Sequence, residues 1–137
     1  MNVAEVKALL NSSWHIEERL KTEYMTIQRL RTAASKSTPS YSQSPGGGGN
    51  GQKIENCVLS IVEMERRSEE TIKRLLETKA KIHCMIEQLT DLRLKTLLQK
   101  RYLNYEKWEN IAVDMHCSYR RVHQLHSKAL LHLARIS

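Results

Sequence analysis

The sequence feature that most constrains the fold is an apolar repeat between residues 54 and 89, which advances in alternating steps of four and three. Eight of its eleven positions are apolar, and the full set is Ile54, Val58, Ile61, Glu65, Ser68, Ile72, Leu75, Lys79, Ile82, Ile86 and Leu89. A repeat of 3.5 residues keeps one stripe of a helix against a partner helix. The pattern therefore predicts a long helix in a coiled coil.

A partner for this helix precedes it in the chain. Residues 2–34 carry apolar side chains at steps of mostly three or four, which predicts another helix; they are Val6, Leu9, Leu10, Ile16, Leu20, Tyr24, Ile27, Leu30 and Ala34. Residues 35–52 are rich in Ser, Gly and Pro with almost nothing apolar, which is typical of a flexible loop. Residues 1–90 are therefore expected to form an antiparallel helical hairpin for oligomerisation or interaction.

The loop also has the glycine spacing of a phosphate-binding loop, at Gly46 and Gly51. Such a loop needs a lysine directly after the second glycine, then Ser or Thr, and an apolar strand before the loop. Gln52 stands where the lysine should be, Lys53 is followed by Ile54, and no apolar strand precedes. We therefore reject a nucleotide site here.

The composition favours an all-α protein. Charged residues and leucines are plentiful, whereas there are two prolines and no phenylalanine. No stretch approaches the roughly 18 apolar residues of a membrane span, and no signal peptide is recognisable at the N-terminus. We expect a cytoplasmic protein in a bacterial host cell. No catalytic constellation is present, so we expect no enzyme and no cofactor, and the three widely spaced cysteines predict no disulfide framework.

Positive charge is concentrated at the C-terminal end. Residues 91–137 hold nine Lys and Arg against four Asp and Glu, a net charge of +5 out of +7 for the whole chain. A basic end on a nearly balanced body favours a polyanionic partner for that end. The plainer interpretation is a solvated surface with no partner.

Residues 91–137 predict three shorter helices. Asp91 is a suitable N-cap for the first, which runs through Leu94, Leu97 and Leu98 to Tyr102 and also includes Leu92. Residues 103–106 connect it to a short helix over 107–115. Residues 116–118 form a turn, with Ser118 as the N-cap of a last helix whose apolar face holds Val122, Leu125, Ala129 and Leu133.

Two short helices joined by a tight turn, with a basic outer face on the second, predict a helix-turn-helix. The close helix crossing needs a small residue, which is Ala112, and the buried positions Ile111, Met115, Cys117, Val122 and Leu125 are apolar or thiol. The turn often needs a positive φ, which favours Gly. His116 stands there instead, and His is among the residues enriched at positive φ.

The same segment raises the possibility of a metal site, since His116, Cys117, His123, His126 and His132 lie close in sequence. A structural zinc usually has four ligands, commonly with paired cysteines, and none are paired here. Cys117 is more simply a small buried residue at the turn, and His132 lies near the carbonyl end of its helix. We therefore expect no metal.

The stretch DLRLKTLLQKRYLNYEKWENIAVDMHCSYRRVHQLHSKALLHL resembles region four of bacterial sigma factors, the module that reads the −35 promoter element. The similarity lies in the order R-Y-L, W-E-x-I-A, S-x-x-R-V-x-Q-L and A-L. The whole chain resembles phage-encoded ArpU-type late-operon transcriptional regulators. The resemblance implies DNA binding and control of phage late or packaging genes. Nothing resembles region two, which melts promoters, so we do not expect the chain to act as a sole sigma factor.

The resemblance also implies which residues contact DNA. It places Tyr119, Arg120, His123 and Gln124 of the helix that starts at Ser118 against base edges and nearby phosphates. Arg120 has the donors for guanine, Gln124 can pair with adenine, and Tyr119 or His123 can reach a phosphate or a thymine methyl. Arg121, Lys107 and Lys128 are better placed for phosphates, and Ser118 completes the set of candidate DNA-binding residues.

Two further functions compete with the regulator. One is a DNA-packaging protein like a small terminase subunit, in which the DNA module usually comes first rather than last. The other is an interaction module that grips bacterial RNA polymerase.

A homodimer through the hairpin is expected, because each long helix carries a second apolar stripe. In the first helix, the second stripe lies beside Leu9, Ile16, Leu20 and Ile27 and consists of Val3, Val6, Leu10 and Trp14. In the second helix, it consists of Cys57, Met64, Leu76 and Met85. The plainer alternative is a monomer whose C-terminal unit folds back onto the hairpin.

Overall fold

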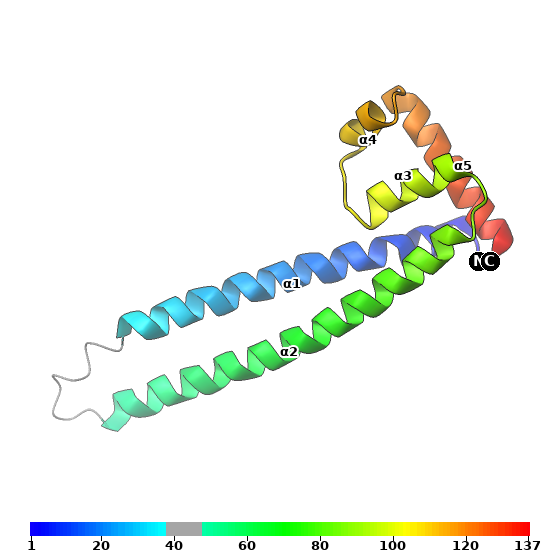
Figure 1. Ribbon diagram of the computed structural model, residues 1–137. Coiled ribbons are helices and arrows are strands. Elements are labelled where there is room, and N and C mark those ends of the chain that lie inside the picture. The colour runs from blue at the N-terminus through cyan, green and yellow to red at the C-terminus, as the bar shows by residue number, and fades with distance from the viewer. Residues whose placement is uncertain (38–47) are drawn as a thin grey trace. The chain divides into compact units, whose positions relative to one another are not determined.

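The computed structural model describes residues 1–37 and 48–137 and contains five helices over that part of the chain (Figure 1). They are α1 (Val3–Ser37), α2 (Gly48–Glu87), α3 (Leu92–Tyr102), α4 (Trp108–Asp114) and α5 (Tyr119–Ile136). None of the described residues forms a strand, and the prediction of an all-helical protein is confirmed for them.

The predicted loop over 35–52 is too long at both ends. Helix α1 continues to Ser37 and α2 already begins at Gly48, while residues 38–47 lie outside the described part. The physical reason is that adding a residue to an existing helix costs far less than nucleating one, so weak helix formers are carried along at helix ends.

The second helix also ends earlier than its apolar repeat. Helix α2 stops at Glu87, and the amides of Gln88 and Leu89 bond to the carbonyls of Met85 and Ile86 in two tight turns. Leu89 nevertheless stays buried, at 2% exposure. The repeat therefore identified a buried position correctly, although that position lies beyond the helix.

The described chain divides into two compact units. One comprises residues 1–16 and 75–137, and the other comprises residues 17–74. These units differ from the predicted division at residue 90, since the start of α1 and the end of α2 belong with α3, α4 and α5.

The unit of residues 1–16 and 75–137 has one continuous apolar core built from all five helices. Its buried members are Val6, Leu10, Ile82, Met85, Ile86, Leu89, Leu94, Leu97, Leu98, Tyr102, Ile111, Ala112, Val122, Leu125, Ala129, Leu130 and Leu133. Val6 and Leu10 are fully buried there. The sequence predicted Val6, Leu10 and Met85 as part of a seam between two chains. That assignment is wrong, because the core of their own chain covers them.

In the unit of residues 17–74, α1 and α2 run antiparallel. Arg31 pairs with Glu65, and Ser68, further along α2, donates a hydrogen bond to Glu23, earlier on α1. Ile27 and Ile61 are the buried apolar side chains of this unit.

Several predicted seam positions of this unit are exposed instead, namely Tyr24, Leu30, Val58 and Ile72. Two helices have only one mutual contact line, so they cannot cover a broad apolar surface by themselves. The side chain of Ile54 lies outside the described part.

None of the helices in the described ranges has both the length and the apolar character that a bilayer span requires.

The shared core of the first unit predicts that the start of α1 stabilises the C-terminal helices. Leu10→Ala is expected to lower the free energy of unfolding by about 2–5 kcal/mol, because it leaves a cavity in a closed core. Urea denaturation followed by circular dichroism measures this loss. The matched control is Leu92→Ala, since Leu92 lies on α3 at 75% exposure and its truncation should stay within about 0.5 kcal/mol. Equal effects of the two changes would contradict the shared core.

Candidate functional site

Side-chain caps fix where α3 and α5 begin. The carboxylate of Asp91 accepts hydrogen bonds from the amides of Arg93 at 2.8 Å and Leu94 at 3.4 Å. The hydroxyl of Ser118 accepts from the amide of Arg121 at 3.0 Å. Both caps were predicted from the sequence and are confirmed. They satisfy amides that have no partner within a helix, and so set the first exposed turn of each helix.

The turn between α4 and α5 is held by its backbone. His116 has φ of 55°, as the sequence analysis expected for this position. The His116 amide donates to the carbonyl of Val113 at 3.1 Å, and the Cys117 amide donates to the carbonyl of Ala112 at 3.0 Å. This pair of bonds is the Schellman arrangement that closes a helix with one left-handed residue. The direction of α5 after α4 therefore follows from local hydrogen bonding.

Apolar contacts then lock α3, α4 and α5 together. Ile111, Ala112, Val122 and Leu125 are all buried, and Met115 and Cys117 are half-buried against the same core. The small side chain of Ala112 lies at 6% exposure, which fits the close approach predicted for it. Leu92, which was grouped with the apolar residues of α3, is instead exposed because it precedes the buried stripe of Leu94, Leu97 and Leu98.

Helix α5 has two sharply different faces. Its buried face carries Val122, Leu125, His126, Ala129, Leu130 and Leu133. The side chains of Arg120, Arg121, Gln124 and Lys128 are exposed, and Tyr119 is 51% exposed. Arg121 donates a 3.4 Å hydrogen bond to the amide oxygen of Gln124. All five are residues that the sequence singled out, and they lie together on the first two to three turns of α5.

His123 occupies a different environment from these neighbours. It is half-buried, with ring centroids 4.8 Å from Trp108 and 4.5 Å from Tyr119. Its Nε2 is buried and has no hydrogen-bond partner in the described part of the chain. His123 thus packs against the Trp108 and Tyr119 rings and is not an exposed polar group like its neighbours.

Trp108 is a packing residue that the sequence analysis did not single out. Arg101 lies over its ring, with the guanidinium carbon 4.7 Å from the centroid. The only sequence signal for this cluster is the pair Tyr119 and His123, whose spacing of four residues places them on one helix face.

His126 is a core histidine. Its Nε2 lies 2.6 Å from the hydroxyl of Tyr102, in a buried contact across 24 residues of sequence. Burial lowers the pKa of His126 to about 4, and the positive charges of Lys7 and Arg101 act in the same direction. Burial likewise raises the pKa of Tyr102 to about 12. Both side chains are therefore neutral near pH 7.

The five residues considered for a metal are not brought together as a ligand set. No group of three or more His, Cys, Asp or Glu side chains with ligand geometry occurs among residues 1–37 and 48–137. His126 is engaged with Tyr102, His123 with two aromatic rings, and His116 is exposed. All three cysteines are free thiols.

The basic residues of the C-terminal helices differ in whether an acidic side chain pairs with them. Lys95 pairs with Glu87, and Lys100 pairs with Glu106 and Asp114, so their charges are largely neutralised. Arg120, Arg121, Lys128 and Lys107, the N-cap residue of α4, form no ion pair with any described residue. Uncompensated positive charge therefore lies on the exposed face of α5 and at the start of α4. Arg93, Arg101 and Arg135 also form no ion pair with a described residue.

The amino-acid sequence matches the model of one protein family. The model of the family described as "Protein of unknown function (DUF1492)" matches residues 35–134, a range that contains α2, α3, α4 and nearly all of α5. No curated protein and no solved structure matches the chain.

The buried Tyr102–His126 pair predicts a pH-dependent stability. The folded pKa of His126 is lowered from 6.5 to about 4, so its contribution is complete above pH 6.5 and is lost as the pH falls toward 4. The loss is on the order of 3 kcal/mol of unfolding free energy. The double variant Tyr102→Phe with His126→Leu removes both polar groups and should flatten this part of the pH profile. Urea denaturation at a series of pH values from 7 to 4 measures it.

The control is Tyr102→Phe alone. It keeps His126 buried, so the protein becomes less stable but keeps the wild-type dependence on pH. Identical profiles for the wild type and the double variant would show that His126 does not control acid stability.

Proposed function

The chain belongs to the DUF1492 family, whose function is unknown, and we propose that it is a sequence-specific DNA-binding regulator of transcription. The residues of α3, α4 and α5 act as a helix-turn-helix module, and α5 enters the major groove. The observation that carries the proposal is the exposed set of Arg120, Gln124 and Lys128 without acidic partners, on a helix whose opposite face is locked in the core.

The dimensions and chemistry of α5 suit the major groove, which is about 12 Å wide and admits one helix. Arg120 and Gln124 are one helical turn apart, so their side chains address neighbouring base pairs. Arg120 offers paired donors to guanine O6 and N7, and Gln124 can bond adenine N6 and N7. In the free protein Gln124 accepts from Arg121. Binding exchanges this weak bond for contacts with DNA.

Phosphate contacts fall to the flanking cations. Arg121 lies between the two reading positions along α5, Lys128 lies one turn beyond Gln124, and Lys107 is the N-cap residue of α4 without a side-chain cap hydrogen bond. Each can release a counterion when it meets a phosphate. Tyr119 packs against His123 and is 51% exposed, so its hydroxyl is available to a phosphate in this proposal. Ser118 stays engaged as the cap of α5.

The remaining residues serve dimerisation in this proposal, through a hairpin formed by α1 and α2. Within residues 17–74, an apolar set is exposed to solvent, consisting of Tyr24, Met25, Leu30, Val58, Leu59, Val62 and Ile72. A groove of about 680 Å³ lies on the same unit between Leu20, Tyr24 and Ile72. A second copy packed as a four-helix bundle would cover this surface, and a dimer would present two reading helices to a repeated or inverted site.

By resemblance to ArpU-type regulators, the controlled genes are phage late or packaging genes. Mapping of bound chromosomal and phage sites in the producing cell tests this assignment. Sharp occupancy upstream of a late operon supports the regulator. Occupancy confined to a packaging start site favours a terminase-like role, and occupancy that follows RNA polymerase without a motif favours an interaction module.

Substitutions on α5 are expected to distinguish residues that contact specific bases from residues that contribute only electrostatic attraction to DNA. Arg120→Ala and Gln124→Ala should each weaken binding to the mapped site by about 1–3 kcal/mol without changing the fold. Lys128→Ala should weaken binding to all DNA alike and reduce the slope of affinity against salt by about one. Fluorescence anisotropy with the mapped duplex and a scrambled duplex at several salt concentrations measures both effects.

Arg135→Ala is the matched control, since Arg135 is an exposed arginine in the last turn of the same helix. It should leave sequence discrimination unchanged. Full affinity of an Arg120→Ala and Gln124→Ala double variant at the same salt would refute α5 as the reading helix.

The dimer predicts a mass of about twice the 15.9 kDa of one chain in light scattering. The double variant Leu59→Glu with Val62→Glu places charges in the exposed apolar set and should shift the mass to that of one chain. Leu92→Glu is the control, because Leu92 is also exposed but lies on α3. A single-chain mass for the wild-type protein would exclude the dimer.

A further inference from the structure

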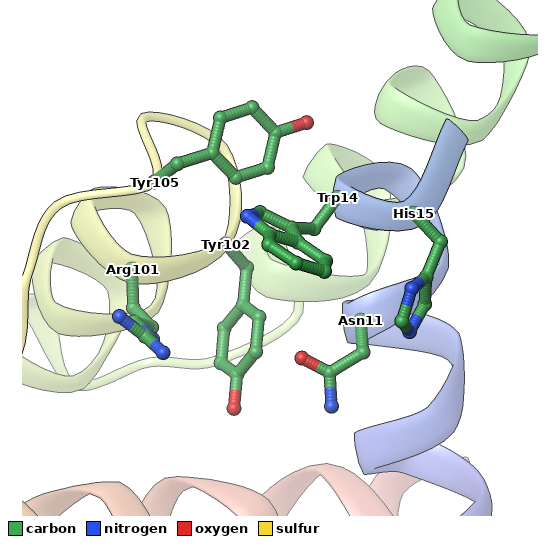
Figure 2. Close-up of a pocket in the computed structure, with 6 residues that line it drawn as sticks. All are labelled: Asn11, Trp14, His15, Arg101, Tyr102 and Tyr105. Carbon is green, nitrogen blue, oxygen red and sulfur yellow. The ribbon is translucent and has the colours of Figure 1, made fainter. Parts of the chain in front are cut away.

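A pocket of about 330 Å³ lies within the unit of residues 1–16 and 75–137, apart from the exposed face of α5. Its walls come from α1, α3 and the connection that follows α3, and they consist of Asn11, Trp14, His15, Arg101, Tyr102 and Tyr105. Figure 2 shows the Trp14 ring at the centre, with Arg101 and the two tyrosines on one side and Asn11 and His15 on the other. The volume is within the range of small-molecule sites.

Hydrogen bonds to residues outside the pocket fix the two tyrosines of its lining. Tyr102 is fixed by its bond to His126. Tyr105 has φ of 56°, and its hydroxyl donates a 3.1 Å hydrogen bond to the hydroxyl of Ser13. Ser13 is fully buried and donates in turn to the carbonyl of Tyr102 at 3.3 Å. A site with fixed walls loses little conformational entropy when a ligand binds.

The electrostatic character of the lining is positive. No Asp or Glu lines the pocket. Arg101 is half-buried and forms no ion pair with a described residue; one of its terminal nitrogens donates to the carbonyl of Glu106 at 3.0 Å. Lys79 lies over the Tyr105 ring at 5.0 Å. A partly buried guanidinium without a carboxylate has unused donors in a fixed plane, which match a planar oxyanion.

From these observations we propose that the pocket binds a small aromatic carboxylate. The carboxylate group pairs with Arg101, and the side chains of Asn11 and Trp14 supply further N–H donors. The flat body of the ligand packs against the Trp14 and Tyr105 rings, with the edge of the buried Tyr102 closing the pocket. These aromatic walls offer contact area that an inorganic anion cannot use, and an uncompensated arginine offers a charge that a neutral ligand cannot use.

The test uses the full chain without DNA, so its result does not depend on the proposed regulatory function. Isothermal titration with 2-naphthoate is expected to show one saturable site per chain. The neutral analogue 2-naphthamide tests the need for charge, and inorganic phosphate tests the need for an aromatic body. Both should bind at least about tenfold more weakly than 2-naphthoate.

Variants locate the binding site. Arg101→Gln and Trp14→Ala should each weaken 2-naphthoate binding at least about tenfold, whereas Arg93→Gln, an exposed arginine of α3 outside the pocket, should not. Trp14 is 45% exposed, so Trp14→Ala remains informative even if Arg101→Gln disturbs the packing on Trp108. The proposal is overturned if no saturable binding occurs, if 2-naphthamide or phosphate binds as tightly, or if Trp14→Ala binds 2-naphthoate as the wild type does.

Discussion

The buried hydrogen bond between Tyr102 and His126 is the contact on which both proposed surfaces depend. It joins α3 to α5 in the middle of an apolar core, where an unpaired hydroxyl or imidazole would cost about 1–3 kcal/mol. On one side of this bond, α5 is held so that its polar face points to solvent. On the other side, the Tyr102 ring forms a wall of the aromatic pocket. A substitution at Tyr102 or His126 is therefore expected to affect both the exposed face of α5 and the aromatic pocket.

Charge pairing divides the basic residues in a way that composition does not reveal. The +5 net charge of residues 91–137 counts every lysine and arginine equally, yet Lys95 and Lys100 are neutralised by acidic neighbours. The cations of α5 remain uncompensated, and Arg101 faces a pocket without acidic residues. An anionic partner gains the most binding energy from cations that have no acidic neighbour within the protein. The exposed face of α5 therefore suits a polyanion, and Arg101 suits a single small anion.

Local sequence signals predicted the elements around the candidate site well. Asp91 and Ser118 are N-caps, and His116 takes the positive φ that the turn requires. Each of these depends on bonds within a few residues, so the sequence itself contains the information. The buried stripe of α5 was also predicted correctly, because a helix of known start has a fixed angular spacing. The exposed set that includes Arg120 and Gln124 follows as the complement of that stripe.

The sequence could not show which apolar stripe is covered by which partner. Val6, Leu10 and Met85 have the same spacing as coiled-coil seam residues, but the C-terminal helices bury them within their own chain. Val58 and Ile72 have that spacing too and are exposed. His123 and His126 lie three residues apart on the same helix, and both contact aromatic rings. The Nε2 atom of His126 bonds to Tyr102, whereas that of His123 has no hydrogen-bond partner in the described part of the chain.

The sequence by itself determined the helices, their caps, the turn at His116 and the basic character of α5, since each depends on residues close together along the chain. Only the tertiary structure decided the shared core, the Tyr102–His126 bond and the pocket around Arg101. These join residues between 24 and about 90 positions apart, and periodicity gives the face on which a residue lies but not what packs against that face.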